Sequence, residues 1–322
     1  MLEQRSFYYK ELSFNEESVD MHLKLYERSF GSSMDRALWM WKYGEGRGRG
    51  VSAFEDERAI AYYGAIERSV YVNGYKRELL GVSDTMVEPS KRGVFSKNGV
   101  FSQIAKKFIS DFSGSERAYS FCFGFPSQRH AKLGEKLGYY SIVDTLYQFL
   151  WKIESKRESF FYAIREITED ELEQNIPKLW SDMSVSFCEA ILGEKSFEFI
   201  KWRYLKHPLN KYKSVALYSR FFNRVKCVII FREHKEDGSV EIMDVIGSSR
   251  YFNSSFELLF GYFYERGFSV VYIWATKTLG NYLPIERVES EVCSVCVTNY
   301  GLESVDDLKG RWLMSGGESD FR

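Results

Sequence analysis

Proline, cysteine and histidine are scarce in this chain of 322 residues, which holds five prolines, five cysteines and four histidines. Five cysteines in a chain of this length do not make the disulfide framework of a small secreted domain. No apolar run reaches the roughly 18 residues that a membrane-spanning helix needs, so we expect no membrane span. The first residues, Met-Leu-Glu-Gln-Arg, lack the apolar segment of a signal peptide. These absences predict a cytoplasmic protein.

An excess of one charge sign is also missing, because the formal net charge is only −1 at pH 7. A nearly neutral chain lacks the basic excess that suits a polyanion, so we predict no nucleic-acid partner. The histidines are scattered, and the C-x-x-C at Cys293 and Cys296 lies in a run that reads as a strand. Residues three apart on a strand point to opposite faces, so we predict no metal site.

Apolar residues make up 44% of the chain and aromatic residues 17%, enough to fill real cores. The length favours two domains of ordinary size. The most informative segment begins with an apolar run typical of a strand, Leu79–Val87, which stops at Pro89. A short basic loop with Gly93 and Gly99 follows it.

An amphipathic helix is predicted from Gly99 to Phe112, because its apolar residues recur at helical spacing. A strand that leads through a glycine-containing turn into a helix makes an anion site. The first N–H groups of the helix lack intrahelical partners, and the helix dipole favours negative charge there. Arg92 and Lys97 add positive charge, so we predict that this turn binds a phosphate or pyrophosphate.

This segment resembles motif A of the GNAT (Gcn5-related N-acetyltransferase) acyltransferases, whose strand, loop and helix grip the pyrophosphate of acetyl-CoA. Pro89, Arg92 and Gly93 fit the family pattern Pro-x-x-Arg-Gly-x-Gly, but Phe95 stands where the second glycine is expected. The resemblance implies acetyl-CoA as co-substrate. It also implies a set of binding residues, namely Met86, Val87, Arg92, Gly93, Lys97, Asn98, Gly99, Val100, Phe101 and Ser127.

A second stretch resembles motif B of the same family, which has the form Asn-x-x-Ala-x-x-x-Tyr-x-Lys-x-Gly-Phe. The run Ala118–Phe123 predicts a strand, and the next helix is expected to have Ser127 as its N-cap and to stop at Gly138. The tyrosine that often serves as general acid in the family would fall near Gly134 and is missing. The resemblance therefore implies that another residue or water takes that role.

The chain also contains an internal repeat. Trp41-Lys42-Tyr43 recurs as Trp202-Arg203-Tyr204, and each triplet is followed by strands. The third strand contains Asp84 in the first half and Asp244 in the second, at spacings of 43 and 42 residues from the tryptophan. Two copies of one α/β unit explain this pattern.

We therefore predict an α/β protein with mixed sheets, made of two GNAT-like domains in tandem around a central cleft. The domains are expected to be residues 1–151 and 152–322, with a charge-rich linker within 152–172. No Pro-x-x-Arg-Gly follows Asp244, so the second domain is expected to be degenerate for CoA binding and to wall off the acceptor cleft. The glycines of residues 44–50 are expected to form a mobile loop.

The resemblance implies that a small-molecule amine, such as an amino sugar, attacks the thioester of acetyl-CoA directly in a ternary complex. A base or a water chain must accept the amine proton. Asp84 and Glu88 are the nearest carboxylates and the candidate catalytic residues, and a backbone N–H near Met86 and Val87 would stabilise the oxyanion. Asp244, at the matching place in the degenerate half, favours a structural role for Asp84.

Two other functions stay open. A Fem-type aminoacyl transferase also uses two GNAT-like units, although the chain lacks the basic helical hairpin and positive charge that would suit tRNA. A non-catalytic CoA-binding or scaffolding protein would explain the missing tyrosine and the irregular loop. The sequence does not specify the acceptor, the acyl chain length or the oligomeric state.

Overall fold

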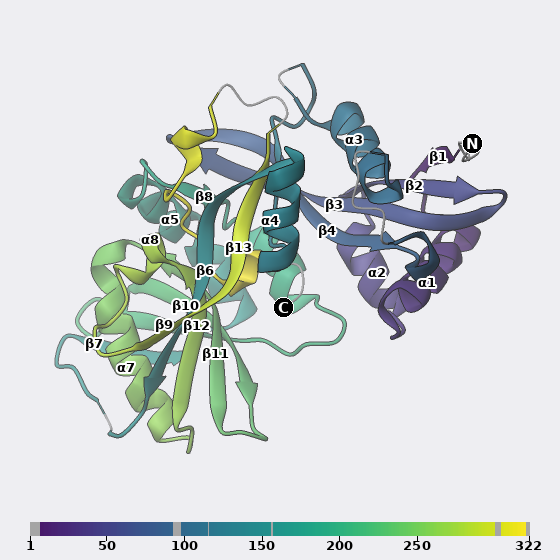
Figure 1. Cartoon of the computed structure of the whole chain (residues 1–322). Coiled ribbons are helices and arrows are strands. Elements are labelled where there is room, and N and C mark those ends of the chain that lie inside the picture. The colour runs from purple at the N-terminus through teal and green to yellow at the C-terminus, as the bar shows by residue number, and fades with distance from the viewer. Residues whose placement is uncertain (1–6, 93–97, 115, 156, 300–303, 320–322) are drawn as a thin grey trace. The chain divides into compact units, whose positions relative to one another are not determined.

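The computed structural model describes residues 7–92, 98–114, 116–155, 157–299 and 304–319. Figure 1 shows helices packed on strands throughout. The helices are α1 (Glu16–Phe30), α2 (Arg36–Tyr43), α3 (Val100–Phe112), α4 (Gln128–Leu137), α5 (Glu169–Ser186), α6 (Phe197–Ile200), α7 (Phe252–Tyr264) and α8 (Lys277–Gly280). Among the described residues, no helix is long and apolar enough to cross a membrane.

The strands are mostly antiparallel, with a parallel pair in each half of the chain. They are β1 (Tyr8–Glu11), β2 (Gly48–Glu55), β3 (Arg58–Val72), β4 (Tyr75–Val87), β5 (Cys122–Gly124), β6 (Tyr140–Lys152), β7 (Tyr162–Glu166), β8 (Ile191–Gly193), β9 (Lys213–Ser219), β10 (Val225–His234), β11 (Ser239–Gly247), β12 (Val270–Thr276) and β13 (Val288–Thr298).

The chain divides into two compact units. The first comprises residues 1–68, 77–142 and 296–305, and the second comprises residues 69–76, 143–295 and 306–322. In the first unit the strands follow the order β1-β2-β3-β4-β5, and in the second β13-β6-β12-β11-β10-β9-β7; only the end of β13, from Cys296, belongs to the first unit. The predicted mixed α/β class is therefore confirmed.

The core of the first unit lies between the sheet and α3. Its apolar side chains include Val51, Ala61, Tyr63, Leu80, Ile104 and Phe108. Helix α3 forms where the spacing of apolar residues predicts it, because that spacing places one stripe of the helix on the sheet. The core of the second unit is larger and includes Trp151, Phe231, Phe256 and Phe263, with α5 and α7 contributing side chains.

Each unit is completed by a strand from the other half of the sequence. β6 enters the second unit after Ile142 and pairs with β12, while Cys296 and Val297 of β13 pair with β5 in the first unit. The hairpin tip of residues 69–76 belongs to the second unit, where Val70–Val72 pair with β8. A chain division at residue 151 cuts through this exchange, and the domain bounds 1–151 and 152–322 stay a prediction.

Two local expectations are wrong in detail. The strand expected over 118–123 is only Cys122–Gly124, because residues 116–120 form turns with one bridge. The expected glycine loop is shorter, since Gly48 and Gly50 lie in β2, where a Cβ on Gly50 would meet the Tyr62 ring at 2.5 Å. The range within which a linker is expected, 152–172, also contains β7 and the start of α5, and the linker stays a prediction.

Candidate functional site

In the first unit, β4 and β5 pair over only two residues each. Leu80–Gly81 lies beside Cys122–Phe123, and β4 then continues to Val87 with no further partner in β5 over these described strands. Within this continuation Asp84 has a φ of 47°, which is a left-handed conformation that bends the strand. The backbone of β4 beyond Gly81 is therefore not used for pairing with β5.

Along the chain, helix α3 is the next α-helix after β4. Its N-cap is Gly99, which has extended backbone angles and no side chain, and no described side chain caps the helix. No acidic residue lies in the first turn, and Gln103 turns back to donate to the carbonyl oxygen of Asn98 at 2.7 Å. The first turn therefore adds no negative charge to the positive pole of the helix dipole, which attracts anions. Of the predicted phosphate residues, Gly93 and Lys97 lie outside the described residues.

Arg92 lies in the exposed start of the loop, but its guanidinium folds back onto the protein. Its Nε donates to the carbonyl oxygen of Val87 at 2.7 Å, and one Nη donates to the carbonyl oxygen of Ser29. The side chain thus fastens the end of β4 to the end of α1. Its role in binding phosphate stays a prediction.

Asp84 is held by two neighbours. Its Oδ2 accepts a hydrogen bond from Lys42 Nζ at 2.9 Å and another from the Tyr43 hydroxyl at 2.8 Å. The Lys42 side chain is only 6% exposed and that of Asp84 11%. Burial, together with the nearby Asp84 charge, raises the pKa of Tyr43, so its hydroxyl stays a donor. Asp84 thus neutralises a buried ammonium, and this geometry favours a structural role.

Glu88 is also fixed in an ionic cluster. Its carboxylate is 8% exposed and pairs with Arg28 Nε at 3.2 Å and with the Arg58 guanidinium. Its backbone N–H donates to the carbonyl oxygen of Ile60 at 2.9 Å. Glu88 therefore joins the end of β4 to α1 and β3 rather than standing free beside the separated strands.

The remaining predicted binding residues lie on both sides of the strand separation. Met86 is buried, and Val87 is half-buried with its carbonyl oxygen bonded to Arg92. Phe101 is half-buried on α3, and its ring contacts Tyr63 at 6.4 Å between centroids. Ser127 is the N-cap residue of α4 as predicted, but its exposed hydroxyl contacts His130 Nδ1 at 3.0 Å instead of capping the helix.

The position of the missing tyrosine has a structural explanation. A Cβ on Gly134 would lie 2.0 Å from the Tyr140 ring, so α4 needs a glycine where that ring packs. The Tyr140 hydroxyl lies 3.4 Å from the Tyr63 hydroxyl. Burial raises the pKa of the nearby Cys122 thiol to about 12, so this thiol stays protonated at neutral pH and is no nucleophile.

The second unit repeats the arrangement around Asp84. Tyr204, from the second Trp-x-Tyr triplet, donates to Asp244 Oδ2 at 2.5 Å, and Lys195 Nζ lies 2.9 Å from the same carboxylate. The internal repeat therefore has a physical counterpart in each unit. The buried lysines were not predicted, although Lys42 lies inside the repeated triplet and could have been suspected as the partner of Asp84.

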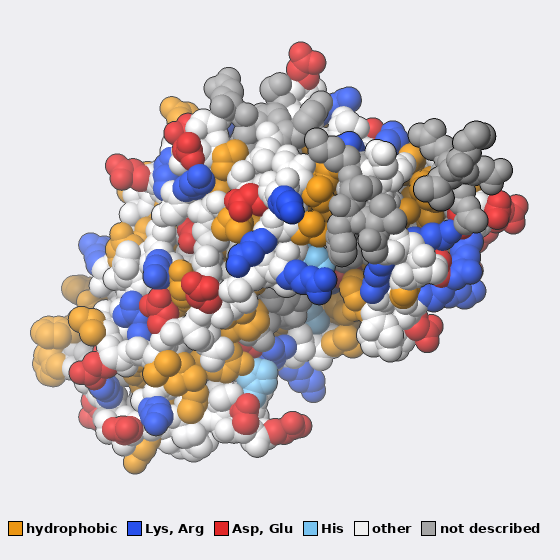
Figure 2. All heavy atoms as spheres, viewed as in Figure 1, with side chains coloured by type: hydrophobic (Ala, Val, Ile, Leu, Met, Phe, Trp, Pro, Cys, Tyr) orange, Lys and Arg blue, Asp and Glu red, His pale blue; other side chains and the backbone are white. Residues whose placement is uncertain are grey.

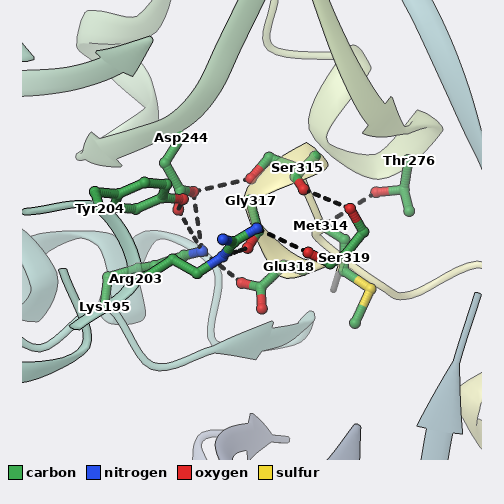
Figure 3. A network of polar contacts seen from close by, with 11 residues as sticks. Lys195, Arg203, Tyr204, Asp244, Thr276, Met314, Ser315, Gly317, Glu318 and Ser319 are labelled. Carbon is green, nitrogen blue, oxygen red and sulfur yellow. Dashed lines mark hydrogen bonds and ion pairs between the residues drawn. The ribbon is translucent and has the colours of Figure 1, made fainter. Parts of the chain in front are cut away.

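In the second unit the parallel strands β11 and β12 also separate, but the C-terminal segment of the chain lies between them. β11 and β12 pair from Ser239–Ile242 with Val270–Ile273, and the C-terminal segment, Trp312–Ser319, lies between their further parts. Ser315 bridges to Ala275 of β12, while its hydroxyl donates to Asp244 Oδ1 of β11 at 2.9 Å. Figure 3 shows this segment inside its polar network.

Buried charges hold the C-terminal segment in place. Glu318 Oε1 lies 2.5 Å from Lys195 Nζ, and the Glu318 side chain is 1% exposed. Arg203 donates to the carbonyl oxygens of Gly317 and Ser319 at 2.9 and 2.8 Å. A Cβ on Gly317 would lie 2.0 Å from the Tyr204 hydroxyl, so the fit leaves no spare room. Sequence reasoning did not detect this segment.

Comparisons with known proteins agree with this geometry. Residues 12–142 match the family model described as Acetyltransferase (GNAT) domain. A search of the curated proteins finds no match. A conserved Enterococcus faecalis V583 protein, described as of unknown function and an N-acyltransferase candidate, superposes with a TM-score of 0.71 at 12% identity, over 91% of this chain and 72% of that chain.

Two further solved structures share the fold. Saccharomyces cerevisiae N-myristoyltransferase with bound myristoyl-CoA gives a TM-score of 0.57 at 11% identity, over 93% of this chain and 84% of that chain. A tandem GNAT protein from the clavulanic acid biosynthesis pathway gives 0.56 at 8% identity, over 91% and 98%. Residues 12–142 therefore match a GNAT domain, and the chain shares its fold with solved GNAT structures.

Proposed function

We propose that the chain is an N-acyltransferase that moves an acyl group from acyl-CoA, acetyl-CoA in the simplest case, to the amine of a small molecule. The observation that carries this proposal is the separation of β4 from β5, followed along the chain by the N-terminus of α3, within the GNAT domain. The five cysteines are all free, which suits a reducing cytoplasm.

The donor would bind along this separation. Pyrophosphate oxygens would accept hydrogen bonds from the first N–H groups of α3, with Arg92 and Lys97 supplying positive charge. The thioester would lie beside the part of β4 that does not pair with β5. There the N–H groups near Met86 and Val87 can stabilise the oxyanion. Gly93, Asn98 and Ser127 would complete the predicted binding set.

The transfer itself forms a C–N bond and breaks a C–S bond. The neutral amine attacks the thioester carbonyl, the tetrahedral intermediate expels the CoA thiolate, and the amine proton passes to the solvent or to a base. Asp84 is bound to the buried Lys42, and Glu88 to the partly buried Arg28 and the exposed Arg58. We therefore propose that water accepts the proton, with neither carboxylate acting as the general base.

Calorimetry with acetyl-CoA tests the donor site. Arg92→Ala combined with Lys97→Ala should weaken binding by roughly 2–4 kcal/mol, since charge-assisted hydrogen bonds are strong but not additive. The matched control is Lys24→Ala with Arg36→Ala, which removes two exposed cations of the same unit. Unchanged affinity in the first variant would remove the proposed phosphate site.

A release assay for the CoA thiol, run over a panel of small amines, tests the reaction. Turnover with at least one amine supports the acyltransferase. Tight acetyl-CoA binding without turnover of any amine would select the non-catalytic alternative. Transfer from aminoacyl-tRNA in place of acetyl-CoA would select the Fem-type alternative.

A further inference from the structure

Four phenylalanine side chains of the second unit are left in water. Phe160 and Phe161 precede β7, and Phe221 and Phe222 lie in the turn between β9 and β10; their exposed fractions are 75, 60, 61 and 73%. We call these four residues the phenylalanine patch. Figure 2 shows hydrophobic side chains gathered at the edge of the molecule where Figure 1 places β7. Exposed apolar side chains in a cluster indicate an interaction site.

Three of the four rings, those of Phe160, Phe161 and Phe221, form one preformed cluster. The ring of Phe160 contacts those of Phe161 and Phe221 at 5.4 and 5.6 Å between centroids. Arg220 joins the two loops, because its backbone N–H donates to the carbonyl oxygen of Phe161 at 2.9 Å and its Nε donates to that of Ser159 at 3.0 Å. The two loops are thus already ordered, and they need not change conformation when the rings bind a partner.

Basic residues predominate in the two segments that carry the rings. The two segments that carry the patch, 157–161 and 220–226, contain four cations and a single acidic residue, namely Arg157, Arg220, Arg224 and Lys226 against Glu158. Arg157 pairs with Glu257, and Lys226 lies over the Tyr251 ring at 5.6 Å. For Arg224, no side-chain partner occurs among the described residues. Exposed aromatic rings next to basic side chains have the chemistry of an interfacial membrane anchor.

We propose that the phenylalanine patch docks the second unit on the surface of an anionic phospholipid bilayer. The rings would enter the headgroup region, and the basic side chains of the two segments would contact the lipid phosphates. A second copy of the chain is a poorer occupant, because a two-fold contact would bring these basic segments against their own copies. This inference concerns where the protein works and does not depend on the proposed acyl transfer.

Vesicle flotation tests the proposal with the full-length protein. It should float with vesicles of phosphatidylcholine mixed with phosphatidylglycerol, and much less with phosphatidylcholine alone. Phe160→Ser with Phe222→Ser should weaken the partition roughly tenfold or more, since burying a phenylalanine is worth over one factor of ten. The control is Val185→Ser with Ile285→Ser, whose side chains are 73 and 83% exposed in the same unit. The control should float like the wild type.

A charge variant separates the two components of docking. Arg224→Gln with Lys226→Gln should weaken binding to the anionic vesicles by roughly fivefold for each cation removed, and salt should have a similar effect. Failure of the wild type to float on anionic vesicles would overturn the proposal. So would a dimer in solution that the Phe160→Ser, Phe222→Ser variant converts to monomer, because the patch would then be a contact between copies.

Discussion

His22 is a buried residue of the first unit whose protonation should couple stability to pH. Its Nε2 contacts Ser52 Oγ at 2.8 Å, its Nδ1 contacts the carbonyl oxygen of Ser18 at 2.6 Å, and its ring stacks on Trp39. Burial lowers the pKa of His22 from 6.5 to about 4. The folded state therefore holds this histidine neutral at pH values where the unfolded chain binds a proton.

The stability due to neutral His22 is fully present above pH 6.5 and is lost as the pH falls toward 4. Between pH 7 and pH 5 the loss should be about 2 kcal/mol, at 1.36 kcal/mol per pH unit. Urea unfolding of the wild type and of His22→Gln at the two pH values measures it. The variant should lose about 2 kcal/mol less than the wild type over this interval. Parallel losses in both proteins would contradict the assignment.

Asp84 gives a second test at the residue scale. Asp84→Asn leaves the Lys42 ammonium buried without its counter-charge, which should cost roughly 3–5 kcal/mol of stability. Asp84→Asn combined with Lys42→Met should recover much of this loss, because it removes the stranded cation. Activity per folded molecule should stay nearly intact in the double variant. A normal melt with turnover reduced roughly 10²–10⁴-fold in Asp84→Asn would instead make Asp84 the base.

At the scale of the element, the C-terminal segment Trp312–Ser319 fills the separation of β11 and β12 in the second unit. In the first unit, the corresponding part of β4 has no partner in β5. Glu318 of the C-terminal segment shares Lys195 with Asp244, so Glu318→Gln removes one of two anions from a buried ammonium. We expect a loss of roughly 1–3 kcal/mol in urea unfolding.

The control for Glu318→Gln is Glu236→Gln, which changes an exposed turn residue and should alter stability by less than about 0.5 kcal/mol. Calorimetry adds a second measurement, the number of acyl-CoA molecules bound per chain. Because the C-terminal segment fills the space between β11 and β12, we expect one. Two bound acyl-CoA molecules per wild-type chain would show that the C-terminal segment yields to the ligand.

The elements differ in how far the sequence predicts them. Helix α3 and the stop of α4 at Gly138 were predictable, because apolar spacing and a left-handed glycine are local signals. The short extent of β5 was not, since an apolar run reads as a strand whether or not a neighbour pairs with it. The C-terminal segment has no such pattern, and only tertiary packing places Glu318 on Lys195.

At the scale of the whole molecule, the repeat was predictable from two triplets and two aspartates, whereas the exchange of strands was not. Sequence order suggests a cut near residue 151, because motif A, motif B and the first triplet all lie before it. Pairing instead carries β6 into the second unit and the end of β13 into the first. Strand pairing between distant segments leaves no mark on either segment alone.

The exchange predicts that neither half is stable alone. Residues 1–151 would lose Cys296 and Val297, which pair with β5, and would leave Val70–Val72 without β8. Residues 152–322 would lose the stretch of β6 that pairs with β12, exposing a buried strand edge. We expect each fragment to lack the cooperative melt of the full chain, and co-expression of the two fragments to restore it. Circular-dichroism melts of the fragments, of the co-expressed pair and of the intact chain make the comparison. A cooperative melt of residues 1–151 near the temperature of the intact chain would show that the exchanged strands contribute little.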